Sequence, residues 1–206
     1  MALAIAFGGT ATYESIMRAD APATFHVVAG DGATSATRIE LPGLVGYHDA
    51  WFSYVIGESP DPPVSFGATV FTREEYAHMQ DVRRVFVAAR IVAVVAAAIA
   101  ALLLLRAWRR DPRAAVVLIR DAAIAAAVGV ALLAVAAAIA FDALFLLFHE
   151  VLFPQGNFLF GPDSNLIAMY PDAYWYGVTL RVGVAFAAAS ALIAIAAAAT
   201  LRQGRR

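Results

Sequence analysis

The chain has no cysteine and no lysine among its 206 residues. Without cysteine, disulfide bonds, thiolate metal sites and a cysteine nucleophile are all excluded. The absence of lysine, in a chain that uses arginine and alanine throughout, indicates genome base composition rather than mechanism. Charged residues are also few, at 15%, whereas hydrophobic residues make up 62% and the mean hydropathy is +0.72. This composition is typical of an integral membrane protein.

Three segments are long and apolar enough to cross a membrane. They span residues 85–105, 122–148 and 175–201, and each supplies the roughly 20 apolar residues that a hydrocarbon core about 30 Å thick requires. The apolar residues 1–9 are too short to span, so we expect them to be the remnant of a truncated first transmembrane helix. A re-initiated chain with its N-terminus outside is the alternative.

The arginines are distributed unevenly, which predicts the topology. Residues 1–85 contain ten acidic side chains and five arginines, whereas the connection at 106–121 and the tail at 202–206 are strongly basic. By the positive-inside rule the two basic segments face the cytoplasm. Residues 10–84 and 149–174 are then extracytoplasmic.

The extracytoplasmic residues 10–84 are predicted to form a small mixed α+β domain. Two short strands, Phe25–Val28 and Thr37–Leu41, are separated by the hairpin-like turn Gly30-Asp31-Gly32. Apolar residues at helical spacing then predict a helix over Leu44–Ile56, and Val64–Phe71 is predicted to return as a strand. The fold class is therefore an α-helical integral membrane protein with three complete transmembrane helices, a truncated N-terminal one and this domain.

A helix start is well marked just before the first complete span. Thr72 and Glu75 have the spacing of a capping box, and Phe71 and Tyr76 that of a hydrophobic staple. The helix that begins here continues into the membrane. It carries His78, Asp81 and Arg90.

The segment 148–160, FHEVLFPQGNFLF, follows the second span directly. It contains proline, glycine and asparagine among four phenylalanines, which is too apolar for a solvated loop and too broken for a helix. We therefore expect a re-entrant or surface-lying loop in contact with lipid. Histidine is the default candidate for proton transfer at such a place, because its ordinary pKa lies near neutrality. His149 and Glu150 are predicted to lie on the same side of the membrane as His78.

Three charged residues, Arg90, Asp142 and Arg181, each lie several residues inside the outer end of a span. Intramembrane charges are costly and are usually paired or functional. An Arg90–Asp142 or Arg181–Asp142 cluster beneath the loop is one prediction. Independent snorkelling of the arginines to the headgroups is the other.

Several motifs resemble a known bacterial family of integral membrane proteins. They are EYAHMQDVR at 75–83, FH at 148–149, FPQGN at 153–157 and DSNLIAMYP at 163–171. Together they are similar to the family that includes the lipoprotein intramolecular transacylase Lit. The resemblance covers about residues 40–201.

The resemblance implies a four-helix membrane enzyme with a small extracytoplasmic domain. Members of the family move the sn-2 acyl chain of a diacylglyceryl-modified lipoprotein onto the α-amine of its N-terminal cysteine, giving a lyso-form lipoprotein. Two essential histidines of these members match His78 and His149. Membrane lipids and diacylated lipoproteins are then the expected partners, and no nucleic acid, cofactor or metal ion is expected.

Acyl migration from an ester to an amine needs a group that accepts the amine proton and returns it to the leaving oxygen. One imidazole of near-neutral pKa can do both, and no covalent acyl-enzyme is needed when donor and acceptor belong to one molecule. His149 is the preferred base, although it could instead cap its own helix C-terminus. Asp81, three residues after His78, could fix the His78 tautomer or form a surface pair. Asn157 could donate to an oxyanion or form a turn.

Two other classes of function stay open at this point. A metal-dependent membrane hydrolase would use His78, Asp81, His149 and Glu150 as ligands, although no HExxH-type spacing supports it. A non-catalytic scaffold or transporter subunit is the other alternative. His26 and His48 are expected to be structural or solvated.

Overall fold

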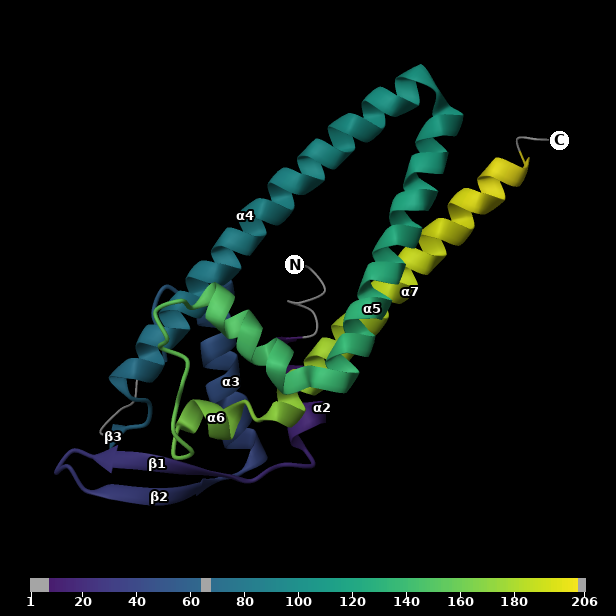
Figure 1. The fold of residues 1–206 in the computed structure, drawn as a ribbon. Coiled ribbons are helices and arrows are strands. Elements are labelled where there is room, and N and C mark those ends of the chain that lie inside the picture. The colour runs from purple at the N-terminus through teal and green to yellow at the C-terminus, as the bar shows by residue number, and fades with distance from the viewer. Residues whose placement is uncertain (1–7, 64–67, 204–206) are drawn as a thin grey trace. The chain divides into compact units, whose positions relative to one another are not determined.

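The computed structural model describes residues 8–63 and 68–203 and divides into two compact units (Figure 1). The first, here called the helical unit, contains Arg90–Leu144 and Leu180–Arg206. The second, here called the mixed unit, contains the chain up to Ala89 together with Phe145–Thr179. Both predicted extracytoplasmic segments fall in the mixed unit. The predicted remnant at 1–9 lies, except for its last two residues, outside the described part of the chain.

Three helices of the structure are long and apolar enough to cross a membrane: α4 (Arg73–Arg110), α5 (Pro112–Leu152) and α7 (Asp172–Gln203). They contain the three predicted spans. Large apolar side chains on them, such as Leu102, Leu132 and Leu192, are exposed. Such outward-facing apolar side chains suit a lipid environment rather than water.

The predicted connection at 106–121 is helical except at Asp111, so α4 and α5 almost meet. Pro112 opens α5 because the first position of a helix needs no N–H donor. The Asp111 carboxylate caps the new helix, accepting from the Arg113 and Ala114 amides at 2.9 and 3.1 Å. Further along, Ala140 has the non-helical angles φ −144° and ψ 50°, so the second predicted span is kinked rather than continuous.

The mixed unit contains a three-stranded antiparallel sheet in the order β2-β1-β3. The predicted hairpin is confirmed as β1 (Ala23–Ala29) and β2 (Thr34–Ile39). The second strand ends before Leu41, which instead begins α3 (Leu41–Ile56). Of the predicted strand Val64–Phe71, the structure gives β3 (Ala68–Thr69), and residues 64–67 lie outside the described part.

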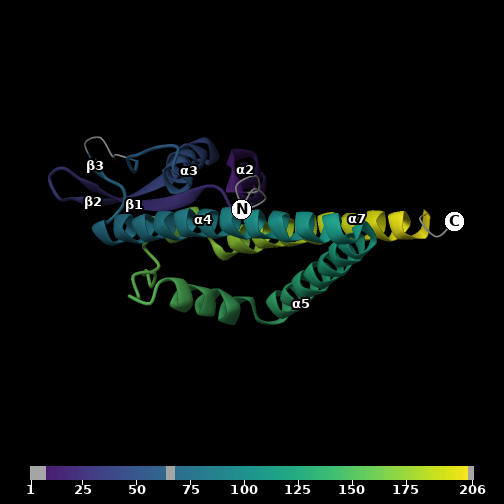
Figure 2. The same cartoon turned by 90° about the horizontal axis from the view of Figure 1, so that it is seen from above.

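An aromatic core holds the mixed unit together. The helix α2 (Thr10–Met17), which the sequence analysis did not predict, lies beside α3 (Figure 2). Both helices contribute to a cluster of fully buried side chains: Tyr13, Met17, Phe25, Leu44, Trp51 and Phe71. Burying each large apolar side chain contributes about 1.5–3 kcal/mol. The cluster therefore supplies the main stabilisation of this unit.

The segment before α7 is attached to the sheet through one side chain. Asn165, at the start of α6 (Asn165–Met169), is buried and bonds to β1 as a neighbouring strand would. Its Oδ1 accepts from the His26 amide at 2.8 Å, and its Nδ2 donates to the His26 carbonyl at 3.0 Å and to the Val70 carbonyl. The side-chain amide therefore brings residues 163–170 against the sheet, as α6 and β1 show in Figure 1.

Candidate active site

The predicted capping box at the start of α4 is confirmed. The Thr72 amide donates to Glu75 Oε2 at 2.7 Å, and the Glu75 amide donates to Thr72 Oγ1 at 3.2 Å. Glu75 is almost fully buried and does more than cap the helix. Its Oε1 accepts from Ser164 Oγ at 2.6 Å and from the Leu166 amide at 3.0 Å. One carboxylate therefore joins the first turn of α4 to the segment that leads into α7.

His78 lies one turn further along α4 and is buried among aromatic rings. Its ring centroid is 4.9 Å from that of Phe153 and 5.4 Å from that of Phe160. Burial, followed by the proximity of His149, lowers the pKa of His78 to about 4. Its Nδ1 atom has no hydrogen-bond partner among the described residues. His78 is therefore neutral near pH 7, with a buried ring nitrogen that the described residues leave unsatisfied.

His149 lies near the end of α5, and the fold brings it beside His78. The two ring centroids are 6.3 Å apart and the ring planes differ by 19°. Phe153 contacts both imidazoles, since its centroid is 5.6 Å from that of His149. Phe145 and Phe158 cover His149 further, at 4.3 and 5.2 Å. Two histidines 71 positions apart (149 minus 78) thus share one largely apolar site.

The hydrogen bonding of His149 fixes its neutral tautomer. Its Nδ1 lies 2.8 Å from the Phe145 carbonyl oxygen, which can only accept, so Nδ1 carries the proton. The neutral ring then presents an unprotonated Nε2. This bond goes to a carbonyl one turn back inside α5, which runs on to Leu152, so it holds the imidazole against its own helix and does not cap the helix end. The role of His149 as the base stays a prediction.

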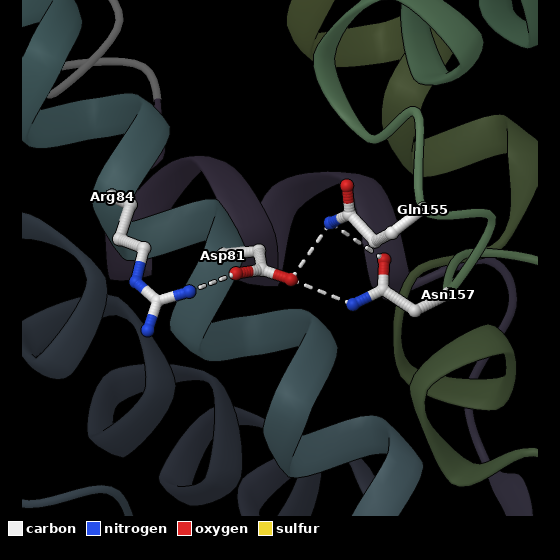
Figure 3. Close-up of polar contacts among 4 residues, drawn as sticks. All are labelled: Asp81, Arg84, Gln155 and Asn157. Carbon is white, nitrogen blue, oxygen red and sulfur yellow. Dashed lines mark hydrogen bonds and ion pairs between the residues drawn. The ribbon is translucent and has the colours of Figure 1, made fainter.

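The turn after α5 places two amide side chains against Asp81 (Figure 3). Pro154 cannot continue the helix, and Gly156 turns the chain with φ +77°. Asp81 Oδ2 accepts from Gln155 Nε2 at 2.8 Å and from Asn157 Nδ2 at 2.7 Å. Burial acts to raise the pKa of Asp81, but these hydrogen bonds and Arg84 outweigh it and lower that pKa.

Asp81 therefore has different partners from those that its spacing suggests. Within the described part of the chain, its hydrogen bonds go to Gln155, Asn157 and Arg84 and not to His78. Direct fixing of the His78 tautomer, one of the two roles expected for Asp81, is not among these contacts. Asn157 in turn has its Nδ2 committed to Asp81, which leaves less of it for an oxyanion.

Comparison with known proteins assigns the family. The family model described as lipoprotein intramolecular transacylase Lit matches residues 35–175, a stretch that includes both histidine motifs. The chain belongs to the Lit family. None of the curated protein sequences compared matches the chain. The solved structure of the membrane integral lipoprotein intramolecular transacylase Lit from Bacillus cereus is similar in fold, with a TM-score of 0.67 at 17% identity. The match covers 81% of this chain and 76% of that one.

Membership of the Lit family makes this chain a member of an enzyme family, and its three apolar helices place it among membrane proteins.

The remaining predicted residues lie elsewhere. Glu150 is exposed, and Arg90, Asp142 and Arg181 belong to the helical unit. The pairing of Asp142 with Arg90 or Arg181 stays a prediction.

The other two histidines of this Lit family member lie away from the pair. His48 is buried, stacks on Tyr13 with ring centroids 4.1 Å apart, and has Nε2 2.9 Å from the Gly8 carbonyl. Burial lowers its pKa to about 4. His26 is half-buried on β1, with Nε2 3.5 Å from Asp163 Oδ1. The expected structural role is thus seen for His48.

The ligand geometry gives no support to a metal-dependent hydrolase. Among the residues that the structure describes, no group of three or more histidine, aspartate or glutamate side chains could hold a metal ion.

The sequence analysis missed the contacts of Gln155, Glu75 and Asn165. Gln155 was named only as part of the family-like motif at 153–157, and for Glu75 only the capping contact was predicted. Nothing local in the sequence marks Asn165 as the link to β1.

Proposed function

We propose that this protein transfers an acyl chain within a diacylated lipoprotein. The chain moves from a glyceryl oxygen of the diacylglyceryl-cysteine to the α-amine of the same cysteine, giving the lyso-form. One observation carries the proposal: the Lit family match spans two histidine motifs far apart in sequence, and their imidazoles lie side by side in the mixed unit.

The reaction requires only a proton transfer around one carbon centre. The amine nitrogen attacks the ester carbonyl carbon, a C–N bond forms, and the C–O bond to the glyceryl oxygen breaks. The amine loses a proton and the leaving alkoxide gains one, so that ester and amine become amide and alcohol. Because both reacting groups belong to one molecule, the site has to align them and handle this proton.

His149 is proposed as the group that carries the proton. Its Nδ1 is bound to the Phe145 carbonyl, so its Nε2 can accept the amine proton and then return it to the leaving oxygen. The phenylalanines around it keep water from the ester and suit acyl chains. The same imidazole serves as base and then as acid, and no covalent intermediate is needed.

His78 is proposed to assist without carrying the proton. Its low pKa keeps it neutral near pH 7, and a second positive charge beside a protonated His149 would be unfavourable. Its Nδ1 is buried and has no partner among the described residues, so a substrate that enters the site would supply one. A placement of the mixed unit on the extracytoplasmic side, where mature lipoproteins are found, belongs to the same proposal.

The proposal is tested with purified protein in lipid vesicles and a synthetic diacylglyceryl-cysteine peptide whose two acyl chains differ in isotope label. We expect tandem mass spectrometry to find one labelled chain on the peptide nitrogen and one remaining ester. With two peptides of different sequence and label, no chain should cross between them. Release of free fatty acid would instead indicate a hydrolase, and crossing of label would exclude intramolecular transfer.

A further inference from the structure

We infer that an arginine cluster in the helical unit is a binding surface for the phosphate headgroups of anionic phospholipids. The cluster lies where α4 ends, α5 begins and α7 ends. It consists of five side chains, here called the arginine cluster: Arg106, Arg109, Arg110, Arg113 and Arg202. The histidine pair belongs to the other unit, and the inference does not rest on acyl transfer.

The packing of α7 against α5 sets the register between the two helices. A Cβ on Gly183 of α7 would lie 3.9 Å from Val130 Cγ1 of α5, so the helices are in contact there. Further buried side chains follow from this contact at steps of seven residues, on α5 towards its start and on α7 towards its end: Ala123, Val116, Ser190 and Ala197. Seven residues are close to two helical turns, so these positions form one continuous contact between antiparallel helices.

The same register brings the arginines to one end of the helical unit. Arg202 lies five residues beyond Ala197, and Asp111 lies five residues before Val116, so Arg202 is level with the junction of α4 and α5. Figure 1 and Figure 2 both show the end of α7 at the same end of this unit as the junction. Asp111 is the single residue between α4 and α5, so the last turn of α4 and the first turn of α5 also meet here.

The positive charge of the arginine cluster is only partly neutralised by the protein. All five side chains are exposed, and the ion pairs found within the described ranges 8–63 and 68–203 do not include them. Asp111 is the one acidic residue between positions 82 and 120, and its Oδ1 accepts from the Arg113 and Ala114 amides. The ends of α4 and α7 add about half a negative charge each, which the start of α5 partly offsets. Five arginines therefore leave an excess of positive charge.

The surroundings of the arginine cluster favour a phosphate that belongs to a lipid. Leu102 and Leu105, on the turns of α4 just before the arginines, are 67% and 48% exposed. Trp108, 49% exposed, lies among the arginines, and tryptophan is enriched where hydrocarbon meets the headgroups. A lipid bound here would place its phosphate beside the arginines and its chains beside the leucines. Basic clusters directly next to a membrane span attract anionic lipids in this way.

Trp108 makes the inference measurable in the intact protein. The chain has three tryptophans; Trp51 is fully buried, and Trp175→Phe removes the third, so Trp108 reports on neighbouring lipid. The protein is reconstituted in vesicles of phosphatidylglycerol and phosphatidylcholine in equal parts, with bromine on the acyl chains of only one of them. Bromine quenches tryptophan fluorescence on contact. Both leaflets have the same composition, so the orientation of the protein does not affect the result.

We expect bromine on phosphatidylglycerol to quench Trp108 more strongly than the same amount of bromine on phosphatidylcholine. The preference should be about 5- to 30-fold in affinity, as expected when one or two arginines contact one headgroup. Salt at about 1 M should reduce this preference, because the Debye length falls to about 3 Å. Equal quenching by the two lipids at low salt would overturn the inference.

Paired variants test whether the arginine cluster causes the preference. Arg109→Gln combined with Arg113→Gln should bring the quenching by the two lipids towards equality. Lysine at both positions should keep most of the preference, because lysine also binds phosphate as a point charge. The matched control, Arg18→Gln combined with Arg38→Gln, removes the same number of charges from ion pairs of the mixed unit and should change nothing. A preference that survives the first double variant, or that is lost in the control, would place the lipid contact elsewhere and contradict the inference.

Discussion

At the scale of single residues, the two histidines of the site differ in what surrounds them. His78 is buried and its pKa is lowered to about 4, whereas His149 is half-buried with its Nδ1 bound to a carbonyl. A base that works near neutrality must accept and release a proton readily. Burial makes His78 the neutral partner, and the bonded Nδ1 of His149 leaves its Nε2 as the atom that we propose accepts the proton.

The buried histidines make the stability of the mixed unit depend on pH. The pKa values of His48 and His78 are about 4 in the folded chain and 6.5 for an ordinary histidine. Between these values the unfolded state binds more protons, so stability is fully present above pH 6.5 and falls as pH drops towards 4. Each group should contribute up to about 1.4 kcal/mol per pH unit in this window.

Thermal unfolding in detergent between pH 7 and 4 measures this slope. His48→Phe, which keeps an aromatic ring on Tyr13, should make the slope distinctly shallower. His26→Gln, at a half-buried position, should leave it unchanged. Equal slopes for the wild type and His48→Phe would contradict the assignment of His48 as a buried neutral imidazole.

Gly156 lies in the site loop at a position whose backbone conformation favours glycine. Its φ of +77° is left-handed, which L side chains adopt at a cost of about 1–2 kcal/mol. Gly156→Ala should therefore shift Gln155 and Asn157 from Asp81 and lower activity several-fold. Gly161→Ala is the control, because a Cβ there meets nothing within 4 Å and the φ is not left-handed. Equal activity of both variants would show that the turn tolerates change.

At the scale of elements, local signals were predicted well. The start of α4 follows from Thr72 and Glu75, which are three residues apart. In the cap, the side chain of each residue bonds to the backbone amide of the other. The hairpin of β1 and β2 follows from its glycine-containing turn. In contrast, α5 begins ten residues earlier than the predicted span at 122, because residues 106–121 were predicted to be a connection and Pro112 instead opens the helix. The eight-residue α2 was missed because its apolar positions are few and it is stabilised by packing on α3.

The long-range contacts of the site could not be predicted from sequence spacing. Asp81 was expected either to fix the tautomer of His78, three residues away, or to form a surface pair, yet its carboxylate bonds to Gln155 and Asn157 in a distant loop. Carboxylates and imidazoles three apart on a helix are neighbours, but a better donor from elsewhere competes for the same oxygen. Which residues face α4 depends on how the loop turns at Pro154 and Gly156, and only the fold determines that.

Glu75 offers a prediction at the element scale. Its buried carboxylate accepts three hydrogen bonds, from Thr72, Ser164 and Leu166. In Glu75→Gln the side-chain NH2 group replaces one carboxylate oxygen, so a donor of the variant should face a donor of the protein. Unsatisfied buried polar groups cost about 1–3 kcal/mol each, and we expect a loss of that order in the stability of the mixed unit. The adjacent Glu74→Gln, at an exposed position in the same turn, should be nearly silent in the same unfolding measurement. Equal losses of stability in the two variants would mean that the stabilisation comes from charge at the helix terminus and not from the buried hydrogen-bond network.

At the scale of the whole molecule, the length of α4 bears on where the site lies. The helix has 38 residues, or roughly 57 Å at 1.5 Å per residue, which is far more than a hydrocarbon core of about 30 Å. Its acidic residues lie before residue 85, and the apolar stretch 85–105 that follows contains one charged residue, Arg90, so we propose that the part that carries His78 projects from the membrane. His149 packs against that same part. On this proposal both histidines lie at one membrane surface.

The absence of cysteine makes this topology simple to measure. Single cysteines introduced by Asp61→Cys and Asp111→Cys can be labelled in intact cells with a membrane-impermeant maleimide. We expect labelling at 61 and none at 111 until the cells are opened, because the positive-inside rule predicts that the arginine-rich connection faces the cytoplasm. The cysteine-free wild type is the blank. Labelling of both positions in intact cells would contradict the proposed sidedness.

The central claim is that the histidine pair performs acyl transfer, and one comparison tests it most directly. His149→Gln, His78→Gln and His26→Gln are assayed side by side for conversion of a diacylglyceryl-cysteine peptide to its lyso-form, after circular dichroism confirms equal folding. Loss of a general base costs about 10²–10⁴-fold, so His149→Gln should be severely impaired and His78→Gln also crippled, with His26→Gln near normal. Near-normal conversion by folded His149→Gln would contradict the account.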